Sequence, residues 1–224
     1  MKKKVLFVFL IMIVCLVAVG CKKKEKEIVV GGWTIDLSTE SLSIPEDALD
    51  TFNKALTNKK DKKLKPITLL ATQTVAGTNY MFFCSDSSDD STYKVVIVYK
   101  DLSGNSSITR ISDFDITKYA GKDSDGATEL LSGGWAINTL QEDAKIREEI
   151  MSTFTEATNM VDDVTYKPVI VLAKQVVSGT NYAILVLRES GETITFNVLT
   201  IYNDLENHAK IINSSYVDLA SFNK

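Results

Sequence analysis

The sequence predicts an α+β protein made of two tandem domains, each with one helix packed on an antiparallel sheet of about four to five strands. Two observations predict this class. First, the Gly-Gly-Trp of residues 31–33 returns at residues 133–135, 102 positions later in a chain of 224 residues. Second, each copy contains one segment with helical periodicity, followed by segments rich in β-branched and aromatic residues.

The repeat continues through most of the chain. Gln-Thr-Val-Ala-Gly-Thr-Asn-Tyr at residues 73–80 returns as Gln-Val-Val-Ser-Gly-Thr-Asn-Tyr at 175–182, again 102 positions later. Tyr-Lys-Asp-Leu at residues 99–102 returns as Tyr-Asn-Asp-Leu at 202–205, at an offset of 103. Two copies of roughly 90 residues could each enclose a small core. We therefore expect domain 1 at residues 28–119, a polar linker at 120–130 and domain 2 at 131–224.

One helix is expected near the start of each copy, ahead of its strands. In copy one, Leu49, Phe52 and Leu56 recur at spacings of three and four, which predicts one apolar helix face. Copy two repeats this spacing at Ile146, Ile150, Phe154, Ala157 and Val161. Strands are expected at residues 67–75, 80–84, 93–99 and 108–111 of copy one. The matching strands of copy two are expected at 169–177, 182–188, 193–202 and 209–212.

The composition argues against several classes of function. The formal net charge is -4, whereas a general nucleic-acid binder needs a basic surface, so we expect no nucleic-acid partner. One His and three Cys supply few ligands for a metal centre, so no metal site and no cofactor is expected. The sequence shows no nucleophile motif, phosphate loop or metal cluster, and we expect that the protein is not an enzyme.

The first 20 residues have the pattern of a secretory signal peptide. Lys2, Lys3 and Lys4 precede an apolar run at residues 5–19. Fifteen residues would form a helix of about 22 Å, shorter than the bilayer core of about 30 Å. A basic start followed by a short apolar segment favours export over a transmembrane span.

Ala18-Val19-Gly20-Cys21 at the end of that segment resembles the lipobox of bacterial lipoproteins. The resemblance implies that residues 1–20 are removed as a lipoprotein signal peptide and that Cys21 carries lipid such as palmitate. Residues 21–27 would then be the lipidated cysteine and a charged stalk, and the protein would be lipid-anchored to the extracytoplasmic side of a bacterial cell membrane. A signal anchor with a chance cysteine is the alternative. Cleavage would leave 22 of the 25 basic groups against 29 acidic groups, a net charge of -7.

Residues 73–80 resemble the central Gln-x-Val-x-Gly motif of cystatins, the protein inhibitors of papain-type cysteine proteases. The closest likeness is to the stefin branch, which lacks disulfides. This agrees with the cysteines, because lipid on Cys21 and loss of Cys15 would leave only Cys84 as a free thiol. The resemblance covers residues 28–224 as two cystatin-like domains. It implies that each helix is wrapped by a curved antiparallel sheet.

The resemblance also implies a function without catalysis, in which a backbone wedge of three segments blocks the protease cleft. The segments would be an N-terminal trunk ending in glycine, the Gln-x-Val-x-Gly hairpin and a second hairpin. In copy one the implied protease-binding residues are Val30, Gly31, Gly32, Gln73, Val75, Ala76, Gly77 and Leu102. In copy two they are Gly133, Gly134, Gln175, Val177, Ser178, Gly179 and Leu205. The second loop of copy two, residues 203–208, lacks both Pro and Gly and has an added charge, so it departs from the pattern.

The expected partner is thus a papain-like cysteine protease, and the expected site of action is the bacterial cell surface. The alternative is a non-inhibitory cystatin-fold module that binds or spaces components of the cell envelope. Several single residues are expected to have structural roles only. Trp33 and Trp135 are expected to be core anchors, Cys84 a small buried hydrophobic residue and His208 a loop residue. The acidic residues 86–90 are expected to form a solvated hairpin tip, because they lack the spacing and distal Glu of a calcium loop.

Overall fold

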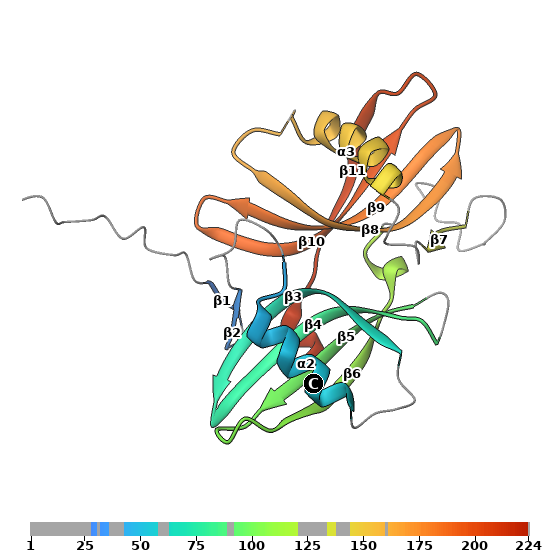
Figure 1. Ribbon diagram of the computed structural model, residues 1–224. Helices are drawn as coiled ribbons and strands as arrows, with labels where there is room; N and C mark the ends of the chain where they lie inside the picture. Colours follow the sequence, from blue (N-terminus) through green and yellow to red (C-terminus); the bar gives the residue numbers. More distant parts are fainter. Residues whose placement is uncertain are drawn as a thin grey trace, which may run out of the picture.

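The computed structural model describes residues 28–30, 32–35, 43–57, 63–88, 92–120, 134–137, 144–159 and 161–223. Figure 1 shows two antiparallel sheets, one formed by each repeat, with one helix lying against each sheet. The lipoprotein signal, the stalk and residues 121–130 of the linker lie outside the described residues. None of the helices in the described part of the chain has the length and apolar character needed to cross a membrane.

Repeat one forms a six-stranded sheet in which neighbouring strands follow sequence order and pair antiparallel. Its strands are β1 (Ile28–Val30), β2 (Trp33–Ile35), β3 (Leu64–Val75), β4 (Gly77–Asp86), β5 (Thr92–Lys100) and β6 (Ser106–Phe114). The helix α2 (Glu46–Thr57) lies between β2 and β3, and the 3₁₀ turn η1 (Ile116–Lys118) follows β6. The helix and four strands predicted for this copy are confirmed.

Repeat two forms a five-stranded sheet with the same sequential order. Its strands are β7 (Ala136–Ile137), β8 (Thr165–Val177), β9 (Gly179–Ser190), β10 (Thr193–Asn203) and β11 (Ala209–Tyr216). The helix α3 (Ala144–Thr158) precedes β8, and the 3₁₀ turn η2 (Leu219–Asn223) follows β11. The predicted helix and strands are again confirmed, except that Val161 lies beyond the end of α3.

Each helix covers the outer face of its own sheet. In repeat one, Ala48, Phe52 and Ala55 pack against β4 and β5, and the Phe52 and Phe82 rings meet edge to face with centroids 5.0 Å apart. Phe154 and its buried neighbours on α3 pack on β9 and β10 in the same way. The buried stripe of α2 differs from the predicted one, because Leu49 is partly exposed and Ala48 takes its place.

The other face of each sheet is also buried, and this overturns the predicted fold class. Met81 and Phe83 on β4 belong to the same continuous core as Leu185 and Leu187 on β9. This shared core has members on β2–β6 of one sheet and on β8–β10 of the other, as well as on both 3₁₀ turns. Each fully buried apolar side chain of this kind contributes roughly 1.5–3 kcal/mol to folding.

The prediction of an α+β fold with two tandem cystatin-like domains, each a helix packed on a curved antiparallel sheet, is therefore wrong. Antiparallel strands dominate the described chain, with only two short helices of 12 and 15 residues. The repeats are joined sheet to sheet, and each helix lies outside the pair instead of being the centre of its own domain. The physical reason is that a sheet with apolar side chains on both faces must bury both of them, so it needs a packed layer on each side.

The C-terminal segment of each repeat contacts the sheet of the other repeat, which strengthens this pairing. The carbonyl oxygen of Ala120, just after η1, accepts a hydrogen bond from Thr200 Oγ1 of β10 at 2.6 Å. That of Tyr119 accepts one from Asn213 Nδ2 of β11 at 2.7 Å. In the opposite direction, the Phe222 ring of η2 stacks on Phe114 of β6, with centroids 6.2 Å apart. The two repeats thus form one packed unit.

Three expectations for single residues hold in this packing. Trp33 is fully buried in the shared core and Trp135 packs against that core, so both anchor the interior. Cys84 is buried under α2, and burial raises the pKa of its thiol well above the ordinary value. The thiol is therefore held in its neutral, unreactive form.

Candidate binding edges

The Gln-x-Val-x-Gly segment of each repeat forms the tight turn between two long strands. In repeat one, β3 and β4 meet at Ala76, and Val75 pairs with Gly77 across the turn. Two residues further from the tip, Asn79 Nδ2 donates a hydrogen bond to Gln73 Oε1 at 2.9 Å. Repeat two has the same bond between Asn181 and Gln175, at 2.8 Å. The glutamines predicted to bind a protease therefore stabilise the hairpin from within.

The glycine of the motif is required by close packing on the neighbouring strand. Gly77 has φ of +129°, and a Cβ atom there would lie 2.4 Å from the carbonyl oxygen of Lys100 at the end of β5. At Gly179, with φ of +127°, it would lie 2.3 Å from that of Asn203. Any side chain would collide with backbone and would also be strained. The absence of a side chain at the motif glycine thus allows the first turn to pack directly against the backbone at the end of the next strand, β5 or β10.

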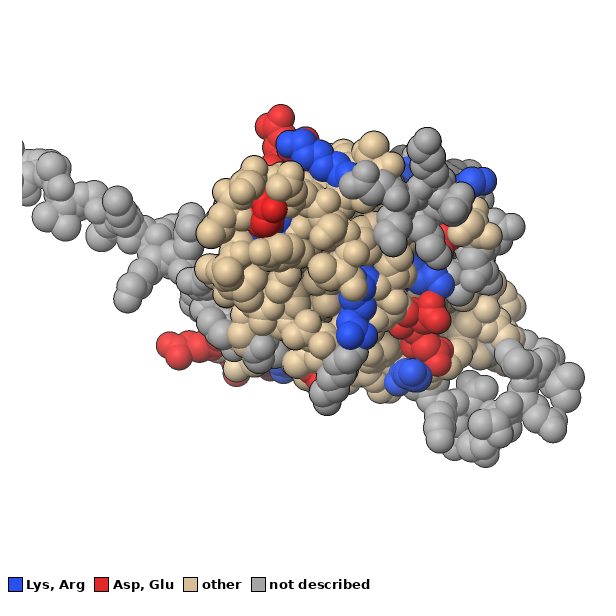
Figure 2. All heavy atoms as spheres, turned by 90° about the horizontal axis from the view of Figure 1, so that it is seen from below, with Lys and Arg blue, Asp and Glu red and all other residues tan. Residues whose placement is uncertain are grey.

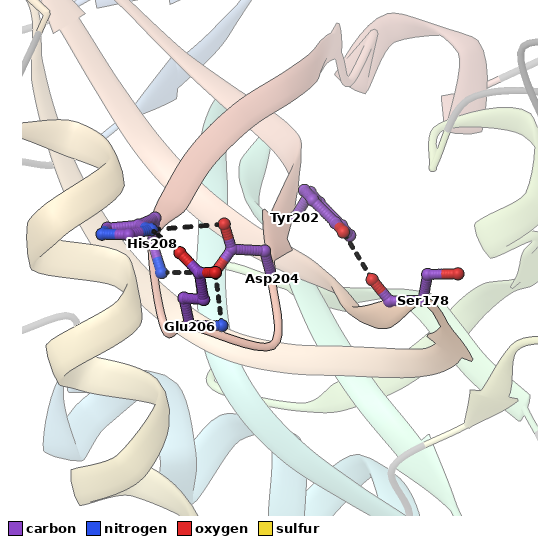
Figure 3. A network of polar contacts seen from close by, with 5 residues as sticks. All are labelled: Ser178, Tyr202, Asp204, Glu206 and His208. Atoms are coloured by element: carbon purple, nitrogen blue, oxygen red, sulfur yellow. Dashed lines mark hydrogen bonds and ion pairs between the residues drawn. The ribbon is translucent and has the colours of Figure 1, made fainter.

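A tyrosine then ties the first turn to that strand. Tyr99 of β5 donates its phenolic hydrogen to the carbonyl oxygen of Ala76. Tyr202 of β10 does the same to the carbonyl oxygen of Ser178, at 2.5 Å, as Figure 3 shows. The first turn of each repeat is therefore held by a tyrosine side chain of the next strand, in addition to the hydrogen bonds between the two strands that it joins. No role for these tyrosines was predicted, although their recurrence at an offset of 103 was a visible signal.

The second loop of repeat one, between β5 and β6, is closed by a single aspartate. Asp101 Oδ1 accepts hydrogen bonds from the backbone amides of Ser103 and Asn105, each at 2.8 Å. Its Oδ2 accepts another from Asn105 Nδ2, also at 2.8 Å. These bonds from Asn105 stabilise the carboxylate and lower the pKa of Asp101 below its ordinary value. Gly104 takes φ of +86° to complete the turn.

The corresponding loop of repeat two, between β10 and β11, has the same construction although it lacks glycine. Asp204 Oδ1 accepts from the amides of Glu206 and His208, at 2.9 and 2.8 Å, and the His208 bond contributes most to a lowered Asp204 pKa. Asn207 adopts φ of +66°, the left-handed conformation that Gly104 has in repeat one. Figure 3 shows Asp204 at the centre of this loop. The departure noted in the sequence therefore leaves the loop geometry unchanged.

These two turns carry exposed apolar side chains at their tips. Leu102 is 86% exposed and Leu205 is 82% exposed, which is unusual for leucine held in an ordered loop. Beside them, Val75 and Ala76 are exposed in repeat one, and Val176, Val177 and Ser178 are exposed in repeat two. The apolar tips therefore lie on a rigid frame without being covered by the described chain.

The predicted N-terminal trunk differs from an extended segment. Ile28–Val30 fold back on Trp33–Ile35 as a short hairpin, with Val30 opposite Trp33. Gly32 is exposed with φ of +81°, close to the amide of Gln73, whereas Gly31 lies outside the described residues. In repeat two, Gly134 is exposed just before β7, and Gly133 lies outside the described residues.

All described segments of the implied wedge thus lie at one end of each sheet. We call residues 32, 75–77 and 101–105 the repeat-one edge, and residues 134, 176–179 and 204–208 the repeat-two edge. Figure 1 shows the tips of β3–β4 and β5–β6 at the lower left and those of β8–β9 and β10–β11 at the upper right. The shared core joins the sheets into one body, and in Figure 1 the two edges lie at opposite ends of it.

The two edges share their backbone geometry but differ in charge. Four exposed charged or titratable residues at or beside the repeat-two edge occupy positions that are neutral in repeat one. The pairs are Lys174 with Thr72, Glu206 with Ser103, His208 with Asn105 and Lys210 with Ser107. His208 Nδ1 lies 3.3 Å from Asp204 Oδ2, within its own loop, as predicted for a loop residue.

The remaining chemistry of the described residues is sparse. They contain no cluster of His, Cys, Asp or Glu that could hold a metal ion. Asp86 lies at the tip of the β4–β5 hairpin, where its Oδ1 accepts hydrogen bonds from the amide and hydroxyl of Ser88.

Comparison with protein-family models and with curated protein sequences finds no match to this chain.

Proposed function

We propose that the protein is a lipid-anchored, extracytoplasmic binding protein whose hairpin edges engage papain-type cysteine proteases without catalysis. The observation that carries this proposal is that two hydrogen-bonded turns with exposed apolar residues, Val75 on the first and Leu102 on the second, lie at the same end of one sheet. Repeat two presents the same pairing with Val177 and Leu205. The resemblance of residues 73–80 to the inhibitor motif supplies the class of partner.

The physical basis is preorganisation. Binding costs free energy for each loop that must be ordered, roughly 0.5–1.5 kcal/mol for each immobilised side chain. Here the turns are already ordered before a partner binds. Hydrogen bonds with the turn backbone hold them, made by the carboxylates of Asp101 and Asp204 and by the hydroxyls of Tyr99 and Tyr202. An apolar tip on such a turn can enter the cleft of a protease. The backbone of the turn would then cover the nucleophile without placing a cleavable peptide bond against it.

A second candidate is a non-inhibitory module that binds or spaces cell-envelope components. The folded-back hairpin of β1 and β2 favours it, because one of the three wedge segments is not extended toward a partner. The charged repeat-two edge also departs from the motif. This candidate predicts binding to wall polymers or surface proteins through the same edges, without any effect on proteases.

Titration of papain with soluble protein starting at residue 22 distinguishes the two. We expect stoichiometric inhibition, lost in the double variant Leu102→Asp with Leu205→Asp. Because both leucines are exposed, the variant should keep its circular dichroism spectrum. Met151→Asp, at an exposed apolar position on α3, is the matched control and should inhibit normally. No inhibition at micromolar excess, with recovery of wall components in a pull-down, would favour the second candidate.

A further inference from the structure

We propose that β11, the last strand of the repeat-two sheet, pairs antiparallel with β11 of a second copy of this chain, so that the two sheets become one continuous sheet. This inference goes beyond the proposed function and does not depend on it, because β11 lies outside both hairpin edges. Three observations carry it: the backbone on the outer side of β11, the pattern of its exposed side chains, and the charges at its two ends.

The outer side of β11 offers backbone groups to another strand. β11 is at the end of its sheet, and the described part of the chain places no strand against its outer side. The amide of Val217, which follows β11, donates a hydrogen bond to the carbonyl oxygen of Phe196 in β10 at 2.8 Å. Because successive residues of an antiparallel strand point their backbone groups to alternate sides, those of Ser214 and Tyr216 point away from β10. They can therefore form a ladder with an added strand.

The exposed side chains of β11 have a large-small-large pattern that is the same in both chain directions. Ile212 is 50% exposed, Tyr216 is 46% exposed, and the small, exposed Ser214 lies midway between them. In an antiparallel pair with Ser214 opposite Ser214, the Ile212 of each copy faces the Tyr216 of the other. Cross-strand pairs of an aromatic and a β-branched side chain stabilise a sheet. The pattern thus fits a second copy related by a two-fold axis at Ser214.

The charges at the two ends of this segment favour the same arrangement. Residues 211–217 carry no charge, whereas Lys210 precedes them and Asp218 follows them, and both of these residues are exposed. Antiparallel pairing brings Lys210 of each copy to the end where the other copy has Asp218, so opposite charges come close together. Parallel pairing would bring like charges together instead.

The corresponding strand of repeat one, β6, lacks these properties. It has Thr109 and Asp113 where β11 has its two exposed apolar residues. The Asp113 carboxylate pairs with Lys94 Nζ at 2.6 Å, and Arg110 adds an exposed positive charge to the same strand. Figure 2, seen from below, shows charged side chains of both signs on the side where repeat one lies. Because charges on an edge strand oppose pairing with another sheet, β11 is the strand suited to self-association.

Cysteine cross-linking tests this contact. In soluble protein starting at residue 22, Cys84 is the only thiol and is buried, so an added cysteine reports its own surroundings. Directly opposite residues of the proposed pair would have Cα atoms about 5.5 Å apart, within the range that a disulfide spans. Under mild oxidation, we expect Ser214→Cys to form a disulfide-linked dimer about tenfold faster than Thr109→Cys on β6, because association raises the effective concentration of the thiol.

The register of the pair supplies a control against chance collision. Ile212→Cys and Tyr216→Cys should each form few dimers alone, since like positions would lie four residues apart along the paired strands, about 13 Å. An equimolar mixture of the two variants should cross-link readily, because position 212 of one copy faces position 216 of the other.

A variant that imports the chemistry of β6 completes the test. Tyr216→Asp gives β11 the residue that β6 has at this position, and it should abolish the rapid cross-linking of Ser214→Cys. Because Tyr216 is about half exposed, the circular dichroism spectrum should stay native. Persistence of rapid cross-linking in this variant, or equal rates at all the cysteine positions, would overturn the proposal.

Sedimentation velocity over a range of concentrations measures the association without any cross-link. We expect a concentration-dependent dimer for the parent protein and a monomer for Tyr216→Asp. A parent protein that stays monomeric and forms no register-specific disulfide would also overturn the proposal, and would leave β11 open to a strand of another protein. Inhibition of papain is measured separately, so failure of the proposed function would leave these results unchanged.

Discussion

The repeat-one and repeat-two edges have the same backbone but different chemistry. In both, an aspartate closes the second loop and a tyrosine holds the first turn. Where repeat one uses Gly104 in a left-handed conformation, repeat two uses Asn207. Asparagine is one of the few residues that adopt this conformation at modest cost, so the loop persists without glycine.

The charges around that common frame have diverged. Ser103 and Asn105 of repeat one correspond to Glu206 and His208 of repeat two. The comparison teaches that the hydrogen bonds and close contacts of the frame constrain a few positions, whereas the exposed positions between them are free to specify different partners. Four predictions follow from this comparison, from the largest expected effect to the smallest.

The largest effect is expected where both repeats depend on the same side chains. Phe83→Ala removes a ring from the core shared by the two sheets and should lower the free energy of unfolding by about 3–5 kcal/mol. Hydrogen exchange should increase in β9 and β10 as well as in β4, because the cavity opens between the sheets. Denaturation by urea, with exchange mapped by mass spectrometry, measures both. Faster exchange confined to repeat one would show that the repeats are energetically independent.

Substitution of the motif glycines should have the next largest effect, and it should be equal in the two repeats. Gly77→Ala and Gly179→Ala each place a Cβ atom against backbone and strain φ, which we expect to cost about 1–3 kcal/mol or more. Gly104→Asn is the matched control, because its φ is also positive but the space around it is open. The control should change the unfolding midpoint little. A large loss for the control as well would show that positive φ alone, and not the close contact, requires glycine.

The charge difference between the edges should give a smaller, salt-dependent effect. With Leu102→Asp blocking the repeat-one edge, binding of papain by the repeat-two edge should change severalfold between low and high salt, because exposed charges are screened over about 8–10 Å. With Leu205→Asp blocking the other edge, affinity should be nearly independent of salt. Titration calorimetry at several NaCl concentrations measures this. Equal salt dependence at both edges would mean that the substituted charges do not face the partner.

The smallest effect is expected from pH, and it should be common to both loops. The pKa values of Asp101 and Asp204 are lowered from the ordinary 3.8, so their contribution to loop order is present above that value. It should be lost as pH falls through the lowered values. Amide chemical shifts of Ser103 and Glu206 report the caps, and both should move in this acid range. Movement of one loop near neutral pH instead would point to another titrating group.

Local structure could be predicted from the sequence in detail. Each repeat has its helix and four of its strands at the predicted positions, because helical spacing and β-branched segments are local signals. The recurrence of Gly77 and Gly179 identified the tight turns before any contact was known. The resemblance assigns Gln73 and Gln175 to partner binding, and this role stays a prediction. Their hydrogen bonds to Asn79 and Asn181 could not be predicted, because a cross-strand bond depends on the register of the strands.

The sequence by itself determined the elements, their order and their duplication, because these depend on residues close together in the chain. Only the tertiary structure decided how the two copies are joined. Residues 81–84 and 183–187 are apolar without alternation, and such strands are buried on both faces. That pattern indicates a second covering layer but does not say what supplies it. Here the other repeat does, because its own sheet has the same uncovered face, and their packing sets the two edges at opposite ends of the molecule.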